Sequence, residues 1–177
     1  MFVLGVDPGL SRCGYAVIEP LGRGKARATA MGVIRTSPDD AVPIRLAELQ
    51  VELRSLLDEF GPVVVAVERI FFQNNVRTAV GVAQASGLAL AEAAGRGIQV
   101  VEYSPTAVKA VVTGDGRAEK EQVQTMVQTF LGLAKPPKPA DAADAAALAL
   151  CHLAHDPTLG RRPRPGSAGG AWEAAAG

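Results

Sequence analysis

The 177-residue sequence has few cysteines, few aromatic residues and no net charge. Its two cysteines, Cys13 and Cys151, are too few for a disulfide framework, and we expect free thiols in a reducing cytoplasm. The 18 basic residues balance the 18 acidic ones, so nucleic-acid binding would need a local basic patch. The most apolar long stretch, residues 79–94, is broken by polar residues and is too short to span a bilayer. These features predict a soluble cytoplasmic protein.

Two short apolar runs, residues 2–7 and 63–68, each end in an acid. Such runs are typical of central strands in a sheet that is covered on both faces. Strand ends open into crevices where loops converge, so Asp7 and Glu68 are candidate site residues. Two structural alternatives stay open here: Asp7 as a turn former before Pro8-Gly9, and Glu68 as the partner of Arg69 in an edge ion pair.

The order of the remaining patterns predicts an α/β fold. Strands expected at 13–19 and 28–36 follow the first strand closely, which indicates an antiparallel meander. Helical patterns then separate the strands expected at 63–68 and 98–103, so these two are reached by crossovers. We therefore predict a five-stranded mixed sheet flanked by helices in a domain of residues 1–156. Residues 157–177, rich in Arg, Pro, Gly and Ala, are expected to form a disordered tail.

A second pair of acids, Asp141 and Asp144, lies three residues apart at the start of an alanine-rich helix and hence on one face. Acids at a helix start also complement the helix dipole, so this pair alone could be structural. Together with Asp7 and Glu68, the pair would form a carboxylate cluster that needs a counter-ion. An all-oxygen donor set suits Mg²⁺ or Mn²⁺, and two such ions about 4 Å apart are typical of phosphodiester hydrolysis.

Four motifs, which follow one another along the chain, resemble those of the bacterial RuvC Holliday junction resolvases, and the similarity covers about residues 2–155. The resemblance implies an RNase H-like fold and a homodimer that nicks two opposed strands of a four-way DNA junction with Mg²⁺ or Mn²⁺. It also implies the RuvA and RuvB branch-migration complex as partners. The family's four acidic positions match Asp7, Glu68, Asp141 and Asp144. The motifs are Asp7-Pro8-Gly9 with Gly14-Tyr15, residues 68–71, residues 118–123 and residues 140–145.

The resemblance also suggests which residues bind DNA. The aromatic position of the family matches Phe71, with Phe72 as a second candidate, and either ring could stack on unpaired bases. The structural alternative is a loop tucked into the core. Lys109 and Lys120 match basic positions near the scissile phosphate, and helical spacing places Lys120 on the core-facing stripe of its helix. Weaker candidates for contacts to the DNA backbone are Arg69, Arg77 and Arg117.

We expect Asp7, Glu68, Asp141 and Asp144 to bind two Mg²⁺ ions, with Lys120 as a further catalytic residue. Two other functions remain open at this point. The same fold could recognise branched DNA without cutting it, or it could cleave an RNA/DNA hybrid instead of a junction. Cleavage assays on a four-way junction and on a hybrid duplex separate the three possibilities.

Overall fold

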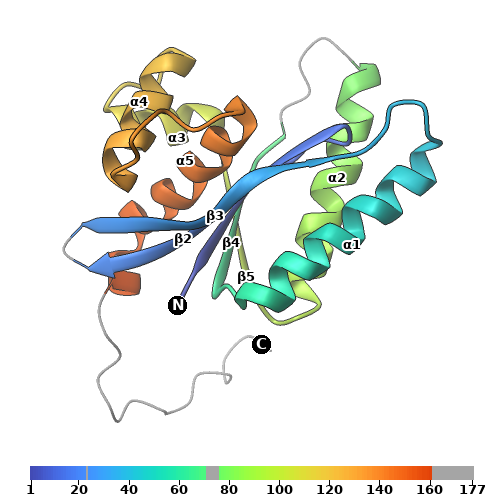
Figure 1. Cartoon of the computed structure of the whole chain (residues 1–177), viewed down its shortest axis with the longest axis horizontal. Helices are drawn as coiled ribbons and strands as arrows, with labels where there is room; N and C mark the ends of the chain where they lie inside the picture. Colours follow the sequence, from blue (N-terminus) through green and yellow to red (C-terminus); the bar gives the residue numbers. More distant parts are fainter. Residues whose placement is uncertain (23, 71–75, 161–177) are drawn as a thin grey trace, which may run out of the picture.

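The structure is a computed structural model that describes residues 1–22, 24–70 and 76–160. A central sheet is built from β1 (Val3–Asp7), β2 (Arg12–Gly22), β3 (Lys25–Arg35), β4 (Val64–Glu68) and β5 (Gln99–Tyr103). Five longer helices cover it: α1 (Val42–Phe60), α2 (Val76–Ala94), α3 (Pro105–Thr113), α4 (Lys120–Leu131) and α5 (Ala140–His155). Figure 1 shows the sheet between two helical layers, α1 and α2 on one side and α3, α4 and α5 on the other.

The strand order β3-β2-β1-β4-β5 confirms the predicted mixed sheet. β1 to β3 form the antiparallel meander, whereas β4 and β5 run parallel to β1 and are reached through α1 and α2. β1 lies in the centre and is buried up to its last residue because both of its faces are covered. The two parallel strands β1 and β4 therefore end at the same edge of the sheet. The meander strands β2 and β3 are longer than the sequence pattern predicts.

Two hydrophobic cores fill the space between the layers. Under α1 and α2, Leu49, Leu53 and Leu57 pack against the sheet at helical spacing, and Gly61 ends α1 in the left-handed conformation, with φ 51°. On the opposite face the alanine-rich α5 packs closely over β1 and β2 together with α3 and α4. Both expected cysteine thiols are free and buried within these cores.

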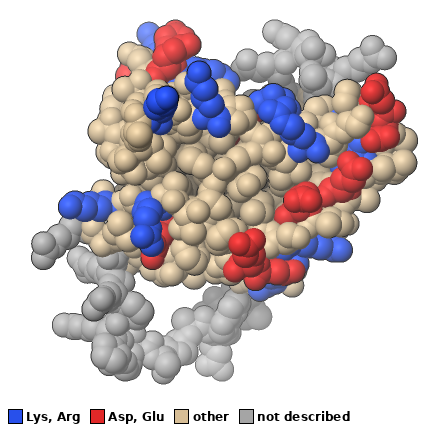
Figure 2. Space-filling model, viewed as in Figure 1, with Lys and Arg blue, Asp and Glu red and all other residues tan. Residues whose placement is uncertain are grey.

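The outer surface of α1 is acidic. Figure 2 shows acidic side chains gathered over this helix, whereas basic side chains are spread over the rest of that face. The acids of α1 are exposed and are Glu48, Glu52, Asp58 and Glu59. The zero net charge of the chain is therefore unevenly distributed, and α1 is the side of the molecule that repels a polyanion.

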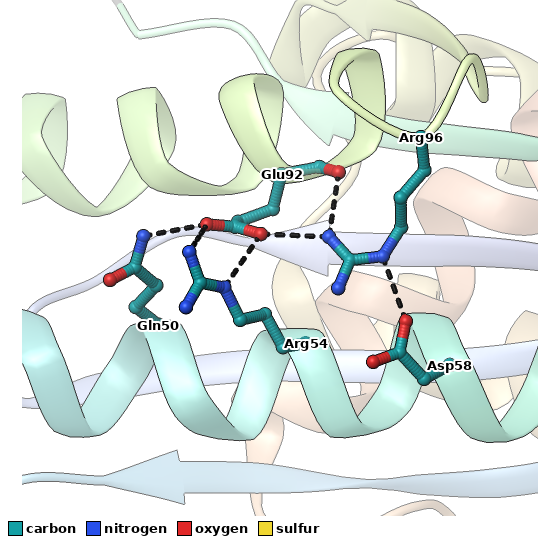
Figure 3. A network of polar contacts seen from close by, with 5 residues as sticks. All are labelled: Gln50, Arg54, Asp58, Glu92 and Arg96. Carbon is teal, nitrogen blue, oxygen red and sulfur yellow. Dashed lines mark hydrogen bonds and ion pairs between the residues drawn. The ribbon is translucent and has the colours of Figure 1, made fainter.

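A network of polar side chains joins α1 to α2 and to the turn that follows α2 (Figure 3). Glu92 of α2 is only 9% exposed and accepts hydrogen bonds from Gln50, Arg54 and Arg96 at 2.6 to 2.9 Å. Arg96 also contacts Asp58 of α1, at 2.8 Å. A buried carboxylate is costly without partners, and here it has two guanidinium groups.

The last described segment is a short 3₁₀ helix, η1 (Pro157–Gly160), which follows α5. Leu159 packs against the core under α5, and η1 lies directly after residue 156, where the domain is predicted to end. That boundary stays a prediction. The rest of the predicted tail, residues 161–177, lies outside the described residues. No helix in the described part of the chain is both long and apolar enough to cross a membrane.

Candidate active site

Two candidate acids lie at the ends of adjacent parallel strands. Val6 of β1 pairs with Val67 of β4, and Asp7 and Glu68 are the next residues along these strands. Both side chains are half-buried, in contrast to the fully buried residues that precede them. The sheet topology therefore brings together the carboxylates that the sequence separates by two strands and a helix.

The other two candidate acids come from the first turns of α5, which touches the sheet with its backbone. A Cβ atom on Gly5 would stand 1.9 Å from the carbonyl oxygen of Ala145, and one on Gly14 would stand 2.1 Å from that of Asp141. Because no side chain fits between them, α5 sits directly on β1 and β2. This close approach carries Asp141 and Asp144 to the end of β1. We call Asp7, Glu68, Asp141 and Asp144 the acidic edge.

The acidic edge is electrostatically strained. Burial, followed by the charges of the other three carboxylates, raises the pKa of Asp7 to about 8. Burial and the charge of Asp144 also raise the pKa of Glu68. The pKa of Asp144 is raised by burial even though Lys120 lowers it. Burial acts on Asp141 in the same direction, but the hydrogen bonds from Arg12 and other contacts outweigh it, and the net pKa is lowered.

Two cations contact this edge in the described part of the chain. Arg12, the first residue of β2, forms an ion pair with Asp141, and the Nζ atom of Lys120 lies 3.4 Å from Oδ2 of Asp144. Lys109 of α3 is near enough for its charge to lower the pKa of Asp144. Lys120 precedes the buried Val123 and Val127 at helical spacing, as predicted, and its side chain reaches toward α5. The side chain is nevertheless 69% exposed, so its ammonium group meets the edge at the surface.

The turn between Asp7 and Arg12 is braced by residues that sequence reasoning missed. Thr36 donates to the carbonyl oxygen of Leu10 at 2.6 Å, and the buried Arg45 of α1 donates to Thr36 Oγ1 at 2.9 Å and to Ser11 Oγ. Arg45 lies on the same helix face as the buried Leu49 and Leu53. An arginine on such an apolar face is the sequence signal that could have indicated its role. These contacts fix the backbone that carries Asp7 and Arg12.

The donor chemistry of the acidic edge fits Mg²⁺ or Mn²⁺, because it offers carboxylate oxygens without thiolate or imidazole. Within the described residues, however, no three His, Cys, Asp or Glu side chains form a set that could hold a metal ion as they stand. Asp141 and Asp144 instead face Arg12 and Lys120. The four carboxylates thus interact through their charges in this structure, and their joint role as metal ligands stays a prediction.

A cavity of about 610 Å³ opens beside the edge. It is lined by Glu68 at the end of β4, by Arg69 after it, by Val82 of α2, and by the start of α3, where Ser104 and Thr106 supply hydroxyl groups. Arg69 and Arg117 are exposed, as backbone contacts to DNA would require. Phe71 and Phe72 lie outside the described residues, and of Arg77 only the backbone within α2 is described.

The mixed sheet and its acidic edge define an RNase H-like nuclease, and similarity to known proteins shows to which family of nucleases the chain belongs. A family model described as crossover junction endodeoxyribonuclease RuvC matches residues 3–152. The crossover junction endodeoxyribonuclease RuvC of Salinispora arenicola is 52% identical over 153 residues, which cover 86% of this chain and 87% of that protein. The chain belongs to the RuvC family of crossover junction endodeoxyribonucleases.

Solved structures agree with this assignment. RuvC of Thermus thermophilus superposes with a TM-score of 0.82 at 38% identity, over 88% of this chain and 95% of that one. The same protein in complex with a Holliday junction substrate gives a TM-score of 0.83 at 37% identity, over 88% of this chain and 94% of that one. The identity is high enough to support the family as well as the fold.

Proposed function

We propose that this chain resolves Holliday junctions by hydrolysing one phosphodiester bond in each of two opposed DNA strands. The observation that carries the proposal is the acidic edge, where carboxylates from β1, β4 and α5 meet beside an open cavity. Membership of a family of crossover junction endodeoxyribonucleases supports the reaction and its substrate. Recombination and repair of DNA are the processes in which such an enzyme acts.

The acidic edge would hold two Mg²⁺ ions, with Mn²⁺ as a substitute, through Asp7, Glu68, Asp141 and Asp144. When bound, such ions activate a water molecule and stabilise the leaving oxygen. The side chain of Lys120 approaches this edge from solvent, so its ammonium group can bind an oxygen of the scissile phosphate and offset the negative charge that develops there. Lys109 would assist from α3 by holding a neighbouring phosphate.

The DNA backbone would run along the cavity beside Glu68. Arg69 and the hydroxyl groups of Ser104 and Thr106 line this cavity and could contact phosphate oxygens. Arg117 and Arg77 would add further contacts to the DNA backbone. Phe71 and Phe72 would stack on bases that unpair near the crossover, since stacking on aromatic rings tolerates any sequence.

A junction with two-fold symmetry needs two paired active sites, so we propose that the chain acts as a homodimer. The helix α2 offers a suitable surface. Val80 is exposed, and Gln84, Gly87 and Ala91 follow it on the same exposed face, so the stripe is made mostly of small or apolar residues. A Cβ atom on Gly87 would meet nothing within 4 Å. The further partners of the dimer would be RuvA and RuvB, in the bacterial cytoplasm.

An end-labelled synthetic four-way junction tests this function. The pure protein is incubated with it in Mg²⁺ and in EDTA, alongside a linear duplex and an RNA/DNA hybrid. Paired symmetric nicks on the junction that require the metal are expected. Binding without cleavage in any sequence context would favour a branched-DNA-binding module, and cleavage of the hybrid alone would favour another RNase H-like nuclease.

A further inference from the structure

Arg12 makes the closest ion pair at the acidic edge. Its Nε atom donates to Oδ2 of Asp141 at 3.0 Å, and its Nη2 atom donates to the same oxygen. The pair joins the first residue of β2 to the first turn of α5, which are 129 positions apart in the sequence. Both side chains are partly open to water, with Arg12 43% exposed and Asp141 27% exposed.

Both partners stand on rigid backbone. The turn before Arg12 is held by Thr36 and Arg45, and the amide of Thr36 also donates to the carbonyl oxygen of Ser11 at 3.3 Å. On the other side, the backbone of Asp141 rests on Gly14. The backbone therefore offers little freedom for Asp141 to turn toward an ion. Only the two side chains can move, and they must separate for Oδ2 to become available.

The second ion pair at the edge is different. Lys120 makes one contact to Asp144, at 3.4 Å, through a flexible and more exposed side chain. The forked guanidinium of Arg12 donates through two nitrogen atoms. The pKa directions agree with this contrast, because the pKa of Asp141 is lowered whereas those of the other three carboxylates are raised.

We propose that Arg12 is a positioning residue that holds Asp141 in the metal-free enzyme and competes with the metal ion for its Oδ2 atom. This inference rests on the proposed function, because it takes the acidic edge as the metal site. Metal binding then includes the cost of breaking the Arg12–Asp141 pair. Partly exposed pairs are weak, so removing Arg12 should tighten metal binding by about two- to fivefold.

The test measures Mn²⁺ binding to the full chain by isothermal titration calorimetry, without DNA. Wild type is compared with Arg12→Gln and with Arg35→Gln. Arg35 is a matched control, because it lies opposite Arg12 in the β2–β3 register, is exposed, and removes the same charge from the same end of the sheet. Tighter binding in Arg12→Gln than in Arg35→Gln is expected. In an Asp141→Asn background, Arg12→Gln should change Mn²⁺ binding no more than Arg35→Gln does.

The outcomes separate the inference from the function on which it rests. If wild type binds Mn²⁺ and nicks a junction, but Arg12→Gln and Arg35→Gln bind the ion equally well, the competition does not exist. Weaker binding in Arg12→Gln would also overturn it and would mean that Arg12 orients Asp141 as a ligand. If wild type neither binds Mn²⁺ nor cleaves, the proposed function itself fails. Melting curves in EDTA verify that each variant is folded.

Discussion

The buried Glu92 of the α1–α2 network and the half-buried carboxylates of the acidic edge have opposite surroundings. In the α1–α2 network, one acid, Glu92, has two arginines and a glutamine, and hydrogen bonds from Arg54 and Arg96 lower its pKa to about 2. At the acidic edge, four carboxylates face Arg12 and Lys120, and the pKa of Asp7 rises to about 8. The negative charge of Glu92 is balanced by arginines of the chain itself, whereas the carboxylates of the acidic edge outnumber the cations that contact them.

The difference separates stability from function. A buried acid surrounded by donors holds two helices together and has no capacity left for another cation. A cluster whose carboxylates outnumber its cations costs folding free energy, and it keeps that cost until a cation arrives from solvent. The acidic edge should therefore gain stability from the same substitutions that destroy its chemistry, and the network should show the reverse.

The largest effect is expected for Asp7→Asn. This change keeps the shape of the side chain but removes the charge of the most central carboxylate, so junction cleavage should fall on the order of a thousandfold. Junction binding should remain, because the Asp7 carboxyl group carries no positive charge that could attract phosphate. Single-turnover cleavage and gel-shift assays on the same protein check both expectations. A loss of binding together with cleavage would instead assign Asp7 a structural role.

Glu92→Ala should behave in the opposite way. It leaves Arg54 and Arg96 facing each other without an acid between them, so the melting temperature should fall by a few degrees. Cleavage below the transition should stay within about twofold of wild type, because the network lies apart from the acidic edge. Glu52→Gln, which removes an exposed acid of α1, serves as the control and should leave the melting temperature unchanged.

The pH dependence of stability gives a smaller effect. The pKa of Asp7 is about 8 in the folded chain and should return to its ordinary value of 3.8 on unfolding. Because the folded state binds the extra proton between these values, stability should fall as pH rises from about 4 to about 8 and level off above that. In EDTA, Asp7→Asn should therefore melt a few degrees above wild type at pH 9, and this gap should shrink toward pH 5.

Addition of Mg²⁺ at pH 8 provides the complementary measurement. The ion should raise the melting temperature of wild type more than that of Asp7→Asn, because only wild type has the full set of carboxylates to hold it. In EDTA without Mg²⁺, a difference in melting temperature between Asp7→Asn and wild type that grows as the pH falls would contradict the raised pKa of Asp7.

Sequence patterns predict much of this fold because they are local. The apolar runs that end at Asp7 and Glu68 identify two buried strands, and the order of strands and helices indicates the mixed sheet that the structure confirms. The three-residue spacing of Asp141 and Asp144 likewise predicts a shared helix face. Each element is recognised from residues only a few positions apart, and the order of the elements then indicates the sheet.

The remaining features depend on contacts between distant segments. No sequence pattern indicates that Arg12 pairs with Asp141, because the two side chains meet only once α5 has packed onto Gly14. The same holds for Glu92 and Arg54, which are 38 positions apart and lie on different helices. The exposure of Lys120 was also missed, since helical spacing gives the face of a residue but not how far its long side chain extends.

The smallest effect is expected where an ion pair is neither buried nor crowded. Arg27 of β3 contacts Glu19 of β2 at 2.6 Å, but its side chain is 65% exposed, so water competes with the pair and salt screens it. Arg27→Gln should therefore change the melting temperature by no more than about 1 °C and leave cleavage unaltered. Melting curves at low and high salt check this. A drop as large as that of Glu92→Ala would show that burial is not what separates the structural acids from the surface ones, and the contrast between the two carboxylate groups would need another cause.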